Sequence, residues 1–143
     1  QWLLWRGCRG GSISVSNCGC CGDTSRDGLA KVKSVLPHGA SSPLLAVVWF
    51  GANDSVDSRI NSWQHVPLQR FKANLAMIVK VVKARFQHVI LLSPPPVHLP
   101  TYRAVFWAIH HGESGDGQAM DRSMALTKAY AQAVGEVAEG AGG

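Results

Sequence analysis

The stretch PLLAVVWFGANDS, residues 43–55, decides the fold. Its first eight residues form a continuous apolar run of strand length, which is typical of a strand covered on both faces. The run therefore predicts a central strand of a parallel sheet. It ends in a glycine, an amide and an acid, so the function of these residues at the strand end becomes the next question.

Outward from this strand, short apolar runs alternate with amphipathic stretches, a pattern that indicates an α/β domain with a parallel sheet. Further strands are predicted in SISVSN, residues 12–17, and in HVILLSPPPV, residues 88–97. Apolar residues at helical spacing predict helices between Gly22 and Pro37, from about Phe71 to Phe86, and from about Asp121 to Glu139. Residues 98–120 lack clear periodicity and are interpreted as an irregular excursion with one short helix.

The length and the composition fit one domain, residues 1–143, of which 46% are hydrophobic. No apolar run approaches the roughly 20 residues that span a bilayer, and QWLLWRG at residues 1–7 lacks the features of a secretory signal. We therefore expect a cytoplasmic protein that does not enter a membrane.

The formal charge of +5 could indicate a nucleic-acid partner. In the most basic stretch, residues 65–88, Lys72, Lys80 and Lys83 share one helix face opposite the apolar one. A solvated helix face is the favoured interpretation, with an anion or nucleic-acid patch as the alternative. We therefore expect no nucleic-acid partner.

The four cysteines, Cys8, Cys18, Cys20 and Cys21, all lie in the first 21 residues. Their spacing, without a second paired cluster, is poor for zinc, and adjacent cysteines rarely form a disulfide with each other. Free thiols are therefore favoured over a metal or redox site.

Two polar loops are predicted at the carboxyl ends of strands, where binding groups gather in open α/β sheets. They are NCGCCGDTS, residues 17–25, and GANDS, residues 51–55. A glycine can expose its backbone N–H to a ligand, and an asparagine adds uncharged N–H donors. Together they predict an oxyanion hole, which stabilises the negative oxygen formed when an acyl carbonyl is attacked. The alternative is ordinary turn chemistry, which also favours glycine and asparagine.

These residues resemble the GDSL or SGNH hydrolases, and within them the isoamyl-acetate-hydrolysing esterases. The second motif block of the family is similar to NCGCCGDTS, and the third is similar to GANDS. The resemblance extends to QHVPL at residues 64–68 and to VILLSPPPV at residues 89–97. It covers about residues 17–139, so residues 1–12 are a non-matching N-terminal segment, and the excursion at 98–120 matches poorly.

The resemblance implies a three-layer, flavodoxin-like parallel sheet with helices on both faces, here incomplete. It also implies oxyanion-hole roles for the N–H of Gly22 and the side chain of Asn53, with Gly51 shaping the loop. The implied reaction is serine attack on a small carboxylic ester, proton transfer through histidine and hydrolysis of the acyl-enzyme, without metal or organic cofactor.

The sequence departs from the family in its first block, Gly-Asp-Ser, which carries the nucleophile. Ser12 is the candidate nucleophile here, because Gly10-Gly11-Ser12 is the only similar triplet. It lies only five residues before Asn17, whereas a parallel crossover needs about a dozen residues. Ser12 therefore cannot end a strand that runs parallel to the next one.

The sequence also lacks the last family block, Asp-x-x-His, which supplies the base. AIHHGESGDG, residues 108–117, offers candidates for a base, a carboxylate or a metal site, although a surface loop is the favoured interpretation. These candidates are His110, His111, Glu113 and Asp116.

We therefore expect a GDSL-type esterase domain for small acetate-type esters that is weakly active or inactive alone. A catalytically inactive module that binds small anions or acyl groups is the alternative, and a basic nucleic-acid binder is a third possibility. The sequence does not fix the oligomeric state.

Overall fold

The computed structural model describes residues 15–36, 45–110 and 120–142, with side chains up to residue 105 in the second range. Its elements follow in the order α1 (Ser25–Val35), β1 (Leu45–Trp49), α2 (Leu68–Lys83), β2 (His88–Leu92), α3 (Leu99–His110) and α4 (Met124–Ala141). Ser12, His111, Glu113 and Asp116 lie outside the described residues, as does the side chain of His110. No helix in the described ranges is long and apolar enough to cross a membrane.

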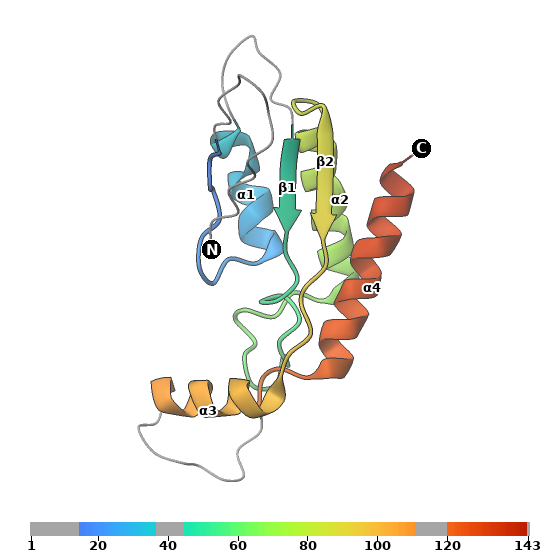
Figure 1. Ribbon diagram of the computed structural model, residues 1–143. Coiled ribbons are helices and arrows are strands. Elements are labelled where there is room, and N and C mark those ends of the chain that lie inside the picture. The colour runs from blue at the N-terminus through green and yellow to red at the C-terminus, as the bar shows by residue number, and fades with distance from the viewer. Residues whose placement is uncertain (1–14, 37–44, 111–119, 143) are drawn as a thin grey trace, which may run out of the picture.

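The sheet has two parallel strands, β1 and β2, whose register runs from Leu45 opposite His88 to Trp49 opposite Leu92. The parallel pair joined through α2 confirms the predicted α/β class. Both strands point toward the end of the molecule where α3 and the start of α4 lie (Figure 1). Loops that follow the strands are therefore gathered at that end.

The core lies between one face of the sheet and the helices α1, α2 and α4. Val48 of β1 is buried there, and side chains of β2 pack against the same cluster. The centre of this core is Phe71 of α2, which has no exposed surface and lies 5.1 Å, between ring centroids, from Tyr130 of α4. The predicted amphipathic face of α2 is confirmed by this packing.

The other face of the sheet is apolar and exposed, which differs from the expected three layers. Side chains alternate along a strand, so every second residue of both apolar runs points away from the helices. These residues are Leu45, Val47, Trp49, Ile90 and Leu92, and each is 39–57% exposed. Among the described residues, helices cover one face of the sheet instead of the expected two.

Two further expectations differ from the structure. The strand expected at residues 12–17 is not formed by its described part, residues 15–17, where Val15 is 71% exposed and has no strand beside it within the described ranges. The excursion at 98–120 contains a helix of 12 residues, α3, which begins at Leu99 after the proline-rich stretch that follows β2. Its apolar residues lack a clean helical period, which is why the sequence pattern missed its length.

Candidate functional site

The loop after β1 turns sharply at Gly51. Its φ angle of 111° lies in the left-handed region, where a side chain would be strained. The glycine is buried, and a Cβ added to it would come within 3.2 Å of Pro94 and 3.3 Å of Phe71. Gly51 therefore allows the chain to leave the strand close to the core, which places Asn53 and Asp54 beside the start of α1.

The Asn53 side chain lies against the loop that contains Gly22. Asn53 Nδ2 donates a hydrogen bond of 2.8 Å to the carbonyl oxygen of Asp23, the residue after Gly22. Gln64 Nε2 donates to the Gly22 carbonyl at 3.2 Å, so a second side chain holds the same loop. The structure thus brings together the two loops that the sequence singled out.

Both proposed donors keep a hydrogen that no described residue accepts. A carboxamide nitrogen carries two hydrogens, and Asp23 accepts only one from Asn53. The Gly22 N–H has no acceptor among the described residues, and Gly22 is exposed with a φ of 86°. Two uncharged N–H donors on adjoining loops can bind an oxyanion or a carboxylate.

Asp54 joins the two loops from inside the protein and has no exposed surface. Its Oδ1 accepts the backbone N–H of Ser25 at 2.8 Å, and its Oδ2 accepts the N–H of Gly51 at 3.1 Å. Burial raises the pKa of the Asp54 carboxyl, and the hydrogen bonds from Ser25 and Gly51 oppose that shift. The sequence shows this acid at the strand end without indicating its role.

A second group of polar residues borders Asn53 on the side of α3 and α4. Arg122, just before α4, donates from Nη2 to Asn53 Oδ1 at 2.9 Å and from Nη1 to the carbonyl oxygen of Ala52. Its Nε donates to the Tyr102 hydroxyl at 3.1 Å, and that hydroxyl donates to Asp121 Oδ1 at 2.7 Å. Burial raises the pKa of the Tyr102 hydroxyl, and the bond to Asp121 adds to the rise. No local sequence pattern predicts this group, because its residues lie in DRS, residues 121–123, and in the excursion at 98–120.

The proposed catalytic groups are not placed by the structure, because Ser12 and the side chains of residues 106–119 lie outside its described part. The described histidines near the loops serve local structure. His65 Nδ1 lies 2.7 Å from the Val56 carbonyl oxygen, and His98 Nδ1 lies 2.7 Å from Thr101 Oγ1. No described histidine is hydrogen-bonded to a serine hydroxyl.

The described cysteines are exposed, and two of the lysines that the sequence singled out are bonded to α4. Cys18, Cys20 and Cys21 are free and exposed, while Cys8 lies outside the described ranges. Lys72 forms an ion pair with Glu136 of α4, and Lys83 donates to the Ala141 carbonyl. Two of the three lysines considered as a nucleic-acid patch therefore contact α4.

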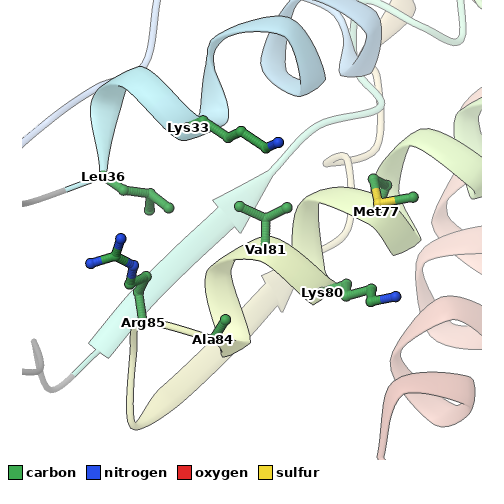
Figure 2. Close-up of a pocket in the computed structure, with 7 residues that line it drawn as sticks. All are labelled: Lys33, Leu36, Met77, Lys80, Val81, Ala84 and Arg85. Carbon is green, nitrogen blue, oxygen red and sulfur yellow. The ribbon is translucent and has the colours of Figure 1, made fainter.

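A pocket of about 430 Å³ lies between the C-terminal halves of α1 and α2. Figure 2 shows Lys33 and Leu36 at the end of α1 facing Val81 of α2 across it, with Arg85 at its rim. The C-terminal ends of α1 and α2, which line the pocket, lie near the start of the strands (Figure 1), whereas Gly51 follows the end of β1. The pocket is therefore separate from the polar loops, which lie at the carboxyl ends where open α/β sheets bind ligands.

The chain is similar to one family of known proteins. The profile of the GDSL-like lipase/acylhydrolase family matches residues 3–143. A GDSL esterase/lipase of Arabidopsis thaliana is 40% identical over 83 residues, which are 53% of this chain and 34% of the relative. An isoamyl acetate-hydrolyzing esterase 1 homolog of Bos taurus is 38% identical over 74 residues, 46% of this chain and 30% of the relative. The chain thus spans about a third of these relatives, and no solved structure matches it significantly.

Proposed function

The chain belongs to the GDSL-like lipase/acylhydrolase family, and we propose that Gly22 and Asn53 are the oxyanion-hole part of an esterase site for small carboxylic esters. The observation that carries this proposal is the 2.8 Å hydrogen bond from Asn53 Nδ2 to the Asp23 carbonyl oxygen. This bond seats the carboxamide against the exposed loop that contains Gly22. In such a site the two donors would bind the oxygen that becomes negative when the ester carbonyl is attacked.

The proposed mechanism assigns separate tasks to the chain's residues. The nucleophile would be a serine, for which Ser12 is the candidate within this chain, and a histidine would transfer its proton. Gly22 and Asn53 would stabilise the tetrahedral intermediate, each donor lowering the barrier by about 2.7–4 kcal/mol. Gly51 and Asp54 would act only through the backbone geometry of the loops.

The proposed substrates are small esters of the acetate type. Support comes from the relatives, because the bovine homolog is named for isoamyl acetate hydrolysis. Support also comes from the donors themselves, since both are neutral N–H groups that suit a neutral ester and its developing oxyanion. We expect little or no turnover by the chain alone, because an oxyanion hole without its nucleophile keeps only a small part of the catalysis.

A second candidate function is a module that binds carboxylates or acyl groups without hydrolysing them. The observation that favours it is that Asn53 Nδ2 and the Gly22 N–H each keep a hydrogen that no described residue accepts, which suits a bound carboxylate. Such a module would use the same two donors. It differs from the esterase in that binding would be independent of Ser12.

One pair of measurements tests both candidates: hydrolysis of p-nitrophenyl acetate and calorimetric titration with sodium acetate at constant ionic strength. The variants are Ser12→Ala, Asn53→Ala and, as a control on an exposed serine, Ser58→Ala. Acetate binding that Asn53→Ala weakens, with negligible turnover, supports the proposed donors. Strong turnover that Ser12→Ala abolishes and Ser58→Ala preserves would show an active esterase and overturn the expected inactivity. Neither binding nor turnover in the unaltered chain would remove the proposal.

A further inference from the structure

Arg122 contacts the oxygen side of the Asn53 carboxamide. Its guanidinium donates from Nη2 to Asn53 Oδ1 at 2.9 Å and from Nη1 to the adjacent backbone carbonyl of Ala52. Two N–H groups of one planar guanidinium are thus directed at two oxygens of neighbouring residues. A rigid donor fork of this kind fixes the position and the orientation of its acceptors.

The two ends of the Asn53 carboxamide have different hydrogen-bond partners, a donor at Oδ1 and an acceptor at Nδ2. An arginine can only donate, so it requires the oxygen Oδ1 on its side, and the Asp23 carbonyl can only accept, so it requires Nδ2 on the other. Rotating the carboxamide by half a turn would place Nδ2 against a cation and Oδ1 against a carbonyl oxygen. Arg122 and Asp23 together therefore select the orientation that turns Nδ2 toward the loop that contains Gly22.

Arg122 is itself held in place before any ligand arrives. Its Nε donates to the Tyr102 hydroxyl at 3.1 Å, and its guanidinium carbon lies 5.4 Å from the centre of the Tyr102 ring. The Tyr102 hydroxyl in turn donates to Asp121 Oδ1, and Asp121 Oδ2 accepts from Asn61 Nδ2 at 3.0 Å. This connected network links α3, the start of α4 and the loop after β1.

We propose that Arg122 is a positioning residue that orients the Asn53 carboxamide as an oxyanion donor. It acts through Asn53 and does not contact the substrate. The positive charge at Oδ1 also draws electron density from the carboxamide, which strengthens Nδ2–H as a donor in the partly buried site. This inference rests on the proposed function, because the orientation matters only if Asn53 Nδ2 binds the oxyanion.

Nuclear magnetic resonance on the full chain tests the orientation without any ligand. The readout is the order parameter of the Asn53 Nδ2 group, which for a side chain held at both ends should approach the rigid-backbone value of about 0.85. In Arg122→Met it should fall below about 0.6, while the backbone signals of β1 and α2 stay unchanged. Arg103→Met, which alters an exposed arginine of α3, is the matched control and should leave the value unchanged.

Two milder variants keep the test decisive if Arg122→Met does not fold. Arg122→Lys retains the charge but lacks the planar guanidinium that donates to two oxygens at once, so the Asn53 order parameter should be intermediate. Tyr102→Phe keeps the ring and removes the hydroxyl that accepts from Nε, so a smaller decrease is expected. An Asn53 order parameter equal to that of the unaltered chain in Arg122→Met, or in both milder variants, overturns the inference.

A titration with sodium acetate separates this inference from the proposed function. If the function holds, acetate shifts the Gly22 amide signal and the Asn53 Nδ2 signals in the unaltered chain, and Arg122→Met or Arg122→Lys binds about two- to tenfold more weakly. If acetate moves neither signal, the proposed function fails even where the order parameter responds to Arg122. If acetate binds equally well in the Arg122 variants, the positioning role fails while the oxyanion donors stand.

Discussion

The Asp54 carboxylate accepts the backbone N–H of Ser25 at 2.8 Å, across 29 residues of sequence. Ser25 is the first residue of α1, where helix N–H groups lack partners within the helix. The same carboxylate also accepts the Gly51 N–H. One buried side chain thus fixes the loop after β1 relative to the loop that carries Gly22, and Asn74 donates to the Ser25 hydroxyl at 3.2 Å from the side of α2.

Removing the Asp54 carboxylate should destabilise the protein strongly. In Asp54→Ala two N–H groups lose their acceptor inside the protein, which should lower the free energy of unfolding by about 2–5 kcal/mol. Asp54→Asn keeps the shape and one acceptor oxygen, so a smaller loss is expected. Urea unfolding followed by circular dichroism measures both. Asp57→Asn, which alters a neighbouring acid bonded to Arg59, is the control, and an equal loss in the control would contradict the role given to Asp54.

Asp54 and Asp57 should give opposite pH dependences. Burial raises the folded-state pKa of Asp54, so its contribution to stability is full below the unfolded pKa of about 3.9 and is lost as the pH rises through the raised value. Hydrogen bonds from Arg59 lower the pKa of Asp57 to about 2, so its contribution is present above about pH 3.9 and is lost as the pH falls toward 2.

Unfolding in urea between pH 7 and pH 3 checks this contrast. The stability advantage of the unaltered chain over Asp54→Asn should grow as the pH is lowered toward 4, whereas its advantage over Asp57→Asn should shrink below pH 4. Parallel slopes for the two variants would show that burial does not govern the titration of Asp54.

The sequence predicts the elements that have a clear period. Strands β1 and β2 and helix α1 lie within the expected stretches, and the ends of α2 and α4 fall within about three residues of the expected ones, because the apolar residues recur at the spacing of each element. The sequence predicts less well which face of the sheet the helices pack against. The run at 43–50 is apolar on both faces, and periodicity cannot say that the described helices pack only against the face that contains Val48.

The two loops of the candidate site could be predicted because their residue types suit hydrogen bonding to a ligand. The residues that complete the site from distant parts of the sequence could not be predicted. The sequence predicts the proximity of the Gly22 loop and Asn53 from two strand ends, whereas in the described residues it rests on hydrogen bonds from Asn53 and Asp54. Asp54 resembles an ordinary turn residue until its complete burial is known. Arg122 lies 69 residues from Asn53, so no local spacing connects them. Contacts of this kind depend on how the helices are arranged around the sheet.

Gly28 in α1 should be intolerant of a methyl group. A Cβ at this position would lie 2.2 Å from Cζ of Phe50, so Gly28→Ala forces the ring or the helix to move. Overpacking costs about 1–3 kcal/mol, which should exceed the helix-propensity gain of about 1 kcal/mol from replacing glycine. Gly135→Ala in α4 is the matched control, because a Cβ there meets no atom within 4 Å, and it should stabilise the protein by about 1 kcal/mol. Urea midpoints that rise in both variants would contradict the predicted contact with Phe50.

The two valines at the centre of β1 should respond differently to the same substitution. Val48 faces the helices and is 6% exposed, whereas Val47 faces away from them and is 55% exposed. Threonine has nearly the shape of valine, so the substitution mainly replaces a methyl group by a hydroxyl. In Val48→Thr that hydroxyl is buried in an apolar core, which should cost about 1–3 kcal/mol of unfolding free energy. In Val47→Thr it remains in water and the change should stay within about 0.5 kcal/mol. Urea unfolding of both variants measures the difference, and a loss at Val47 as large as that at Val48 would mean that the outer face of the sheet is buried in solution.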